Sequence, residues 1–381
     1  MKDRAGSWRR VASGEGTGPP AVVARAALAG LAGLYGLGLA LYRAAYDVGL
    51  IHPRRLPCPV IGIGNLTVGG TGKTTFTRWL ARWLLHRGYH PAILSRGYRS
   101  AAGEGPLVVA DGGGLRAPVE ISGDEPQMLG RSLPGVPVVI GRNRVRSGAV
   151  ACRKLGADVC LLDDGFQYWR LKKDLELVLV DASCPFGYGA LLPRGLLREP
   201  LQALRRADAV LLTHADQARA ETVASVMRAL HERAPAACLA TTRHSAVELA
   251  SLAGEHCAPV SRLGNGRWAA LSSVGQPASF EATLAAAGAT DILPFRFPDH
   301  HRYRLAEIRA VVERARQAGC QAIVTTEKDA VKLEATWFGD LPCWVLRVDL
   351  EFLSGQDEIQ QLLCTRLGAR AGKEAPHYQT A

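Results

Sequence analysis

The chain has 381 residues, which is long enough for two domains. Of these residues 48% are hydrophobic and 21% charged, a composition that excludes a disordered protein. The formal net charge of +11 indicates anionic partners, such as acidic lipid headgroups, phosphorylated substrates or nucleic acid. The nine cysteines form no CxxC pair, which argues against a zinc site and a disulfide framework and fits a reducing compartment. We expect each cysteine to pack as a small hydrophobic side chain.

The first apolar segment, AALAGLAGLYGLGLALY at 26–42, has seventeen residues without a charge and is flanked by Arg25 and Arg43. It is short for a full membrane span, which needs about twenty apolar residues. No convincing cleavage site of small residues follows it, which argues against a signal peptide. We predict a membrane-associated helix within residues 1–50 that lies on or dips into a membrane surface, with its arginines at the headgroups. The alternative is an apolar helix packed on the protein itself.

A glycine-rich segment, NLTVGGTGKTT at 65–75, lies between the apolar run CPVIGIG and a segment of helical periodicity. Such a turn lets backbone N–H groups approach an anion, and the helix behind it adds the positive end of its dipole. A lysine here reaches the outer phosphates, and the hydroxyl after it binds Mg²⁺. The predicted phosphate site comprises Thr67, Val68, Gly69, Gly70, Thr71, Gly72, Lys73 and Thr74. Because Val68 stands where partitioning ATPases carry a second lysine, that class is disfavoured.

From residue 57 onward short apolar strands alternate with amphipathic helices, which predicts a mostly parallel α/β sheet covered by helices. Strands are expected at 60–64, 92–95, 136–140, 159–162, 177–181 and 209–213, and helices at 75–87 and 145–155. After about residue 216 the rhythm restarts, with helices at 221–233, 279–287 and 305–317 and strands at 238–242, 268–272, 292–297, 322–326 and 343–348. The glycine-rich stretch 97–114 predicts a β-hairpin or a mobile loop over the site.

These elements predict a division of the chain into four parts. Residues 1–50 hold the apolar helix, 51–216 a P-loop core domain, 217–368 a smaller α/β domain that closes the cleft, and 369–381 a frayed polar tail.

Two acids, Asp163 and Asp164, end the apolar strand of the segment DVCLLDDGFQYWRL at 158–171. They are therefore expected at the C-terminal edge of the sheet, where ligands bind in open α/β folds. With a phosphate loop upstream, they predict a site for the Mg²⁺ of a nucleotide, directly or through water. A pair of acids that caps the next turn is the alternative.

A carboxylate and a histidine outside the phosphate loop are candidates for proton transfer. Asp124 lies in ISGDEPQML, where helix capping is the ordinary interpretation, and Asp299, His300 and His301 lie in FRFPDHHRYRL. A histidine paired with a carboxylate can take a proton from a hydroxyl near pH 7. The alternative is that His300 and His301 are exposed to solvent and have no catalytic role.

Several arginines suit phosphate oxygens, although most arginines are solvated. Arg142, Arg144 and Arg146 lie in IGRNRVRSGAV, and Arg194 and Arg198 in LLPRGLLREP. The segment VTTEKDAVKL at 324–333 is faintly similar to the guanine-reading motif of GTPases, but Glu327 occupies the asparagine position. We interpret it as a structural or adenine-side loop.

Together these motifs resemble those of the tetraacyldisaccharide 4'-kinase family. The resemblance rests, besides the apolar helix, on GNLTVGGTGKTT, SRGY at 95–98, GDEP at 123–126, LDDGFQ at 162–167, LPRGLLREP at 192–200, FPDHH at 297–301 and TEKDAVK at 326–332. The motifs run in order from about residue 20 to about residue 350.

The resemblance implies a P-loop core and a smaller α/β domain with the active site in the cleft between them. It implies an enzyme of the cytoplasmic face of the inner membrane that uses ATP and Mg²⁺. The γ-phosphoryl group would go to the 4'-hydroxyl of a lipid A precursor, a tetraacylated glucosamine disaccharide 1-phosphate. On this template Lys73 touches the β- and γ-phosphates, Arg198 lies near them, and Asp124 is the catalytic carboxylate paired with His300. The resemblance also assigns three residues to the binding of Mg²⁺, namely Thr74, Asp163 and Asp164.

Two other interpretations stay open. A membrane-recruited P-loop nucleotide switch would keep the phosphate loop and the apolar helix but would need no acid–histidine pair. A nucleic-acid ATPase would account for the basic charge, but no aromatic residues cluster beside the basic ones, which lowers this interpretation. We expect no nucleic acid as a partner, and no protein partner is evident in the sequence.

Overall fold

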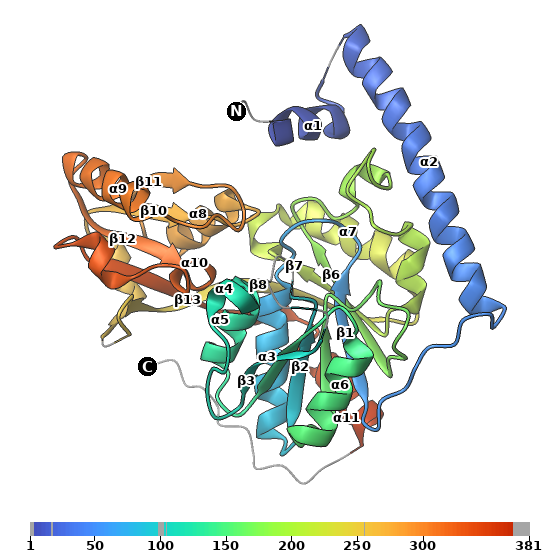
Figure 1. Cartoon of the computed structure of the whole chain (residues 1–381). Helices are drawn as coiled ribbons and strands as arrows, with labels where there is room; N and C mark the ends of the chain where they lie inside the picture. Colours follow the sequence, from blue (N-terminus) through green and yellow to red (C-terminus); the bar gives the residue numbers. More distant parts are fainter. Residues whose placement is uncertain (1–3, 17, 98–102, 104, 255, 369–381) are drawn as a thin grey trace.

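The computed structural model describes residues 4–16, 18–97, 103, 105–254 and 256–368. These residues form one sheet that continues through both halves of the molecule, residues 51–216 and residues 217–368 (Figure 1). Its strand order is β11-β10-β12-β13-β8-β7-β6-β1-β5-β2-β4-β3, and β9 pairs with β8. Only the β3–β4, β8–β13 and β8–β9 pairs are antiparallel among the described strands. The predicted mostly parallel α/β sheet is confirmed.

The P-loop core is built on six parallel strands whose carboxyl ends face the glycine-rich loop, and on one antiparallel edge strand. The parallel strands are β1 (Val60–Asn65), β2 (Pro91–Ser95), β4 (Pro137–Ile140), β5 (Val159–Asp163), β6 (Leu175–Asp181) and β7 (Ala209–Thr213), and the edge strand is β3 (Leu107–Asp111). Every residue of β1, β2, β4, β5 and β7 is buried, as expected for a parallel sheet covered on both faces. The helices of this part are α3 (Lys73–His86), α4 (Val119–Ser122), α5 (Asp124–Ser132) and α6 (Arg144–Lys154).

The second half repeats the alternation of strand and helix. Its elements are α7 (Ala220–Arg233), β8 (Cys238–Ser251), β9 (Cys257–Pro259), β10 (Arg267–Ser272), α8 (Pro277–Ala286), β11 (Asp291–Arg296), α9 (Leu305–Gln317), β12 (Cys320–Thr326), α10 (Glu327–Ala330), β13 (Cys343–Ser354) and α11 (Gln356–Leu367). Short 3₁₀ turns are η1 (Gly187–Gly189), η2 (Leu201–Arg206), η3 (Ala215–Gln217), η4 (Val260–Gly264) and η5 (Ala335–Phe338).

The two long strands β8 and β13 connect the halves. The first residues of β8 pair with β7, and its later residues pair with β13, whose other edge pairs with β12. Because the chain returns along β13, helix α11 packs Ile359 and Leu363 into the same cluster as Leu80 and Leu84 of α3. Helix α7 likewise packs on the core side, against β6 and β7. The segment 217–368 therefore contributes both of its ends to the core of the first half.

The stretch expected as a hairpin or loop, 97–114, contains the edge strand β3, which runs antiparallel to β4. Residues 98–102 and 104 of this stretch lie outside the described residues, and Tyr98 of the SRGY motif is among them. The tail expected at 369–381 also lies outside them.

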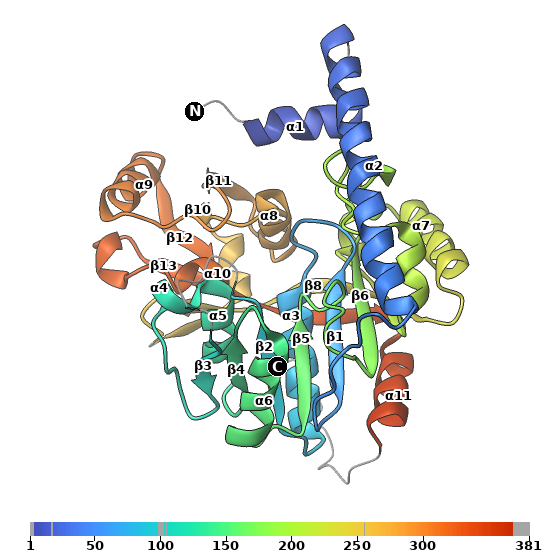
Figure 2. The ribbon, with the colours of Figure 1, turned by 45° about the vertical axis from the view of Figure 1, so that its right-hand side comes forward.

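The N-terminal segment forms α1 (Arg4–Ser13) and α2 (Pro19–Asp47). Helix α2 has 29 residues and extends past the seventeen-residue apolar segment at both ends, because flanking arginines such as Arg25 favour a helix as well. Figures 1 and 2 show its N-terminal part reaching away from the rest of the molecule. Ala32 is its one buried residue, while Leu34 is 67% and Leu41 64% exposed. This exposure does not fit the alternative of a helix packed on the protein itself.

Candidate active site

The glycine-rich loop lies between β1 and α3, as predicted. Gly69 and Gly72 have φ values of 131° and 75°, in the region that favours glycine, and α3 begins at Lys73. The Lys73 ammonium donates to Asn65 Oδ1 at 3.0 Å and lies 3.7 Å from Asp164 Oδ1. Residues 68–75 line a cavity of about 930 Å³ between the two halves. The backbone N–H groups of the loop are therefore placed to meet an anion in this cavity.

One member of the predicted phosphate set, Thr67, is not among the residues that line the cavity. Its carbonyl accepts from Asn65 Nδ2 at 2.6 Å, and it pairs with Leu197 in a β-bridge. The neighbouring backbone bonds, from Val68 N to Leu196 O and from Arg198 N to Leu66 O, fasten the same two segments. The LPRGLLREP segment thus supports the entrance of the phosphate loop.

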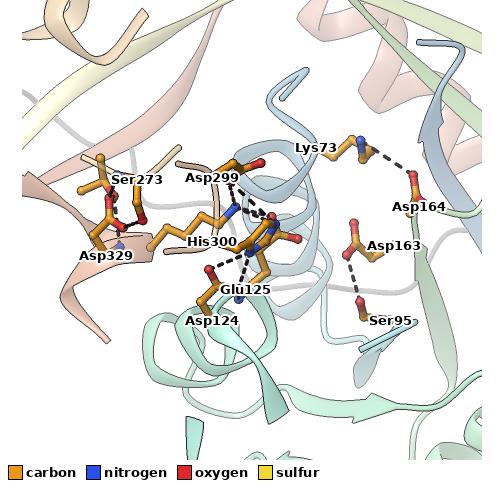
Figure 3. Close-up of polar contacts among 12 residues, drawn as sticks. Lys73, Ser95, Asp124, Glu125, Asp163, Asp164, Ser273, Asp299, His300 and Asp329 are labelled. Atoms are coloured by element: carbon orange, nitrogen blue, oxygen red, sulfur yellow. Dashed lines mark hydrogen bonds and ion pairs between the residues drawn. The ribbon is translucent and has the colours of Figure 1, made fainter. Parts of the chain in front are cut away.

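Asp124 and His300 form a close pair in the cavity, across the two halves (Figure 3). His300 Nδ1 lies 2.9 Å and 3.0 Å from the two carboxylate oxygens of Asp124. Asp124 is the first residue of α5, and His300 follows β11 with a positive φ of 59° while its N–H donates to Ser273 O. The neighbouring His301 contacts Glu307 instead, at 3.0 Å. The structure therefore selects His300 over His301 as the partner of the acid.

The charge of Asp124 is stabilised from several directions. Burial raises the pKa of this carboxyl, but the His300 hydrogen bond and the charges of Lys328 and Lys332 overcome that effect and lower it to about 2. Lys332 Nζ lies 3.7 Å from Asp124 Oδ2. Asp124 is therefore a carboxylate at neutral pH. It pairs with the imidazole, and its Oδ1 also accepts from the N–H of Glu125 in the first turn of α5.

The TEKDAVK segment supplies residues to the same place. Lys328 Nζ donates to Glu125 Oε1 at 3.0 Å and to Asp299 Oδ1 at 3.3 Å, and it lies 3.3 Å from His300 Nε2. Burial lowers the pKa of Lys328, but the surrounding carboxylates, Glu125 first, raise it above its usual value. Sequence reasoning missed this lysine, and the only signal for it was the order of the family motifs.

The flanking acids of this segment are structural. Glu327 accepts from Arg78 of α3 at 2.8 Å on both oxygens, and the fully buried Asp329 accepts from the N–H of Ser273 at 2.9 Å. These contacts agree with the interpretation of the segment as a structural loop.

The two acids at the end of β5 differ in their surroundings. Asp163 is buried and accepts only from Ser95 Oγ, at 3.2 Å, among the described hydrogen bonds. Burial, followed by the charges of Glu125 and Asp164, raises the pKa of Asp163 to about 7. Asp164 accepts from Arg198 Nη1 at 2.8 Å and 2.9 Å; burial raises its pKa, but the charges of Lys73 and Arg198 lower it below its usual value. Figure 3 shows both acids beside Lys73.

Asp163 thus has no cationic side chain in contact with it among the described hydrogen bonds and ion pairs, whereas Asp164 forms an ion pair with Arg198. A buried carboxylate whose charged form is disfavoured by burial and by other acids fits the binding of a cation. Thr74, the second residue of α3, lines the same cavity and offers a hydroxyl.

Of the three arginines after β4, the structure brings one to the cavity. Arg144 is buried, its guanidinium stacks over the Tyr168 ring at 4.4 Å, and it lines the cavity. Arg142 and Arg146 are exposed, because residues two apart point to different sides at the start of a helix. Arg194 donates to Ala12 O of α1 and does not line the cavity.

Three further cavity residues carry no sequence signal because their role depends on tertiary packing. Tyr35 of α2 donates to the carbonyl of Arg198 at 2.9 Å. His214 contacts Asp181 at 3.1 Å, and the His244 ring packs against it at 4.6 Å. Burial lowers the pKa of His244 to about 3, which keeps this ring neutral beneath the phosphate loop. A Cβ on Gly72 would lie only 3.0 Å from His244 Nε2, so the loop and the ring fit closely.

A phosphate loop that faces an acid–histidine pair across one cavity is what transfer of a phosphoryl group to a hydroxyl requires, and it places the protein among the P-loop kinases. The comparisons with known proteins narrow this class. The model of the tetraacyldisaccharide-1-P 4'-kinase family matches residues 24–368, and the chain belongs to that family.

Named relatives cover nearly the whole chain. A tetraacyldisaccharide 4'-kinase of Anaeromyxobacter dehalogenans strain 2CP-C is 44% identical over 359 residues, which is 93% of each chain. One from Geobacter sulfurreducens is 39% identical over 345 residues, covering 91% of this chain and 94% of the relative. The crystal structure of the "apo" form of LpxK from Aquifex aeolicus in complex with ATP is similar with a TM-score of 0.71 and 30% identity, over 90% of this chain and 99% of that one. The resemblance drawn from the motifs is confirmed.

Proposed function

We propose that this protein transfers the γ-phosphoryl group of ATP to the 4'-hydroxyl of a tetraacylated glucosamine disaccharide 1-phosphate, a step of lipid A biosynthesis. The observation that carries the proposal is the Asp124–His300 pair, which faces the phosphate loop across the cavity. Membership of the family and the solved relative with ATP support it. A nucleotide switch without an acceptor would have no use for the pair, so that alternative is not favoured.

The proposed roles follow from position and charge. Residues 68–74 hold the phosphates of ATP, Lys73 contacts the β- and γ-groups, and Arg198 and Arg144 stabilise negative charge on the transferring group. The proton of the acceptor hydroxyl passes to the Asp124–His300 pair, which acts as one unit. With a pKa of about 2, Asp124 is a weak base by itself, so its main role in the pair is to hold and orient the imidazole.

A magnesium ion fits the acids at the end of β5. We assign Asp163, Thr74 and Asp164 to it, with Asp163 as the strongest ligand because Asp164 is also paired with Arg198. When bound, the ion neutralises charge on the phosphates.

The acceptor is a lipid, and α2 offers a way to reach it. Among the described residues α2 is the one helix long and apolar enough to cross a membrane, and 6% of its most apolar window is buried. We propose that the enzyme works at the cytoplasmic face of the inner membrane, where the net charge of +11 favours anionic headgroups.

The deciding experiment is a kinase assay read by mass spectrometry. Purified full-length protein is mixed with ATP, Mg²⁺ and tetraacyldisaccharide 1-phosphate in detergent micelles. The wild type and Glu120→Gln, an exposed acid near the site, should give a lipid heavier by one phosphoryl group, whereas Lys73→Ala and Asp124→Asn should not. Hydrolysis of ATP without a lipid product, insensitive to Asp124→Asn, would overturn the proposal in favour of a nucleotide switch.

A further inference from the structure

Three cysteines meet on one side of the sheet, although Cys58 lies 94 residues before Cys152 in the sequence. Cys58 precedes β1, Cys152 lies on α6 and Cys160 on β5. The Sγ atom of Cys58 is 3.0 Å from that of Cys152 and 3.6 Å from that of Cys160, and the Sγ atoms of Cys152 and Cys160 are 3.9 Å apart. All three pack in the apolar cluster on this side of the sheet, as expected of small hydrophobic side chains, and in addition they contact one another. Because the spacing along the chain follows no metal motif, the cluster could not be predicted from the sequence.

The cluster is separate from the kinase cavity. None of the three cysteines lines that cavity, and they lie near the beginnings of β1 and β5, whereas the phosphate loop follows the end of β1. Cys160 is fully buried, while Cys58 and Cys152 are partly exposed, so the thiols can be reached from one side. Cys58 also lines a small hollow of about 160 Å³ with Arg55, Lys172 and Asp174.

The chemistry of the three side chains suits a soft metal ion. Thiols bind such ions as thiolates, so binding would release protons from the cluster and would be tighter at higher pH.

We propose that Cys58, Cys152 and Cys160 form a binding site for one thiophilic cation of the Zn²⁺ class. With Zn–S bonds of about 2.3 Å, sulfur ligands in tetrahedral coordination lie roughly 3.8 Å apart. Two of the three separations, 3.6 Å and 3.9 Å, are already close to this value. The third, 3.0 Å, widens if Cys58 moves, and Cys58 lies at a bend outside regular structure.

The geometry favours a metal over a disulfide. A disulfide joins two sulfurs at about 2.05 Å and would leave the third thiol without a role, whereas a soft cation uses all three. A cation here would fasten the segment before β1 to α6 and β5. Because the cluster is remote from the cavity, its occupancy should change stability and not turnover.

The test uses the full-length protein in detergent, kept anaerobic with a phosphine reductant, and Cd²⁺ as a spectroscopic probe. We expect one Cd²⁺ per chain with a sulfur-to-metal charge-transfer band in the near ultraviolet, displaced by Zn²⁺, and a raised unfolding temperature with either ion. Cys58→Ser and Cys152→Ser should each weaken binding at least about 100-fold, whereas Cys238→Ser, a partly buried cysteine outside the cluster, should bind like the wild type. All four proteins should retain their lipid kinase activity, which shows that they fold.

Two results would overturn the proposal. One is the absence of the band, or a band equally strong in Cys58→Ser and Cys152→Ser. The other is a mass-spectrometric finding, in protein made without reductant, that Cys58 and Cys152 are joined by a disulfide and that no metal is bound.

Discussion

The imidazole of His300 and the carboxylate of Asp124 are joined by contacts of 2.9 Å and 3.0 Å, although 176 residues separate them in the chain. Asp124 belongs to the P-loop core and His300 to the loop after β11 in the other half. The pair therefore exists only when the two halves are held together, as they are by the shared strands β8 and β13. The proton acceptor is therefore complete only where the cavity around it is also formed.

Removing the charge of Asp124 should slow the chemical step without loosening the nucleotide. We expect Asp124→Asn and His300→Ala each to lower kcat by about 10²–10⁴-fold, the usual contribution of general acid–base catalysis, with KM for ATP nearly unchanged. The double variant should be little worse than either single one, because the two residues act as one unit. Steady-state kinetics with varied ATP and lipid measure this, with His301→Ala as the control. An effect on KM alone would contradict the assignment.

Asp163 should make the stability of the protein depend on pH. Its pKa is raised to about 7 by burial and by the charges of Glu125 and Asp164, against about 3.9 in an unfolded chain. Between these pH values the folded state keeps a proton that the unfolded state releases, so the free energy of unfolding falls as pH rises from about 4 to about 7.

Asp163→Asn replaces the carboxyl by a group that does not ionise, so the free energy of unfolding no longer falls with rising pH on account of this residue. In thermal unfolding without Mg²⁺, the variant should melt at a higher temperature than the wild type at pH 8 and at the same temperature near pH 4. Added Mg²⁺ should stabilise the wild type at pH 8 and have little effect on the variant. Asp216→Asn, an exposed acid, is the control and should match the wild type at both pH values. A variant that is less stable at pH 8 would show that the charge of Asp163 is well compensated.

The ion pair between Arg78 and Glu327 should be important for the contact of α3 with the other half. The Arg78 side chain is 4% exposed and its partner 15%, with a distance of 2.8 Å. Removing one charge of a buried pair is strongly destabilising. Glu327→Gln leaves Arg78 with only the half-exposed Asp349, so it should lower the free energy of unfolding by about 3 kcal/mol. Chemical denaturation measures the loss, with the exposed Glu334→Gln as the control. Equal stability of the two variants would argue that Asp349, 3.3 Å from Arg78, suffices.

Leu34 and Leu41 should contribute to membrane binding through α2. They are 67% and 64% exposed and lie seven residues apart, on one face of the helix. Burying a leucine side chain in an apolar phase is worth about 1.5–3 kcal/mol, so each Leu→Gln change should weaken binding to vesicles at least about tenfold. Sedimentation with vesicles that contain anionic lipid measures it. Leu353→Gln, an exposed leucine of β13, is the control, and equal binding of all variants would exclude this face.

The sequence by itself determined the parts of this protein that are local. The phosphate loop at 65–75 could be predicted because consecutive backbone N–H groups bind the anion, so the signal lies in one short segment. The parallel sheet could be predicted from its buried apolar strands. Helix α2 could be predicted from an uninterrupted apolar run, but the apolar segment at 26–42 is shorter than the helix, because charged residues at its ends do not stop a helix.

The tertiary structure alone decided which distant side chains meet. It brought His300, the histidine that the family resemblance implies, into contact with Asp124, and Arg144 rather than Arg142 or Arg146 to the cavity. It also placed Lys328 beside the acid–histidine pair and gathered the three cysteines of the cluster. It also assigned the ends of the segment 217–368 to the first core, since β8 and β13 cross between the halves. These contacts depend on the phase of the helices and on the order of the strands in the sheet. Residue types and their spacing do not encode such distances, because only the packed chain brings the atoms within reach of one another.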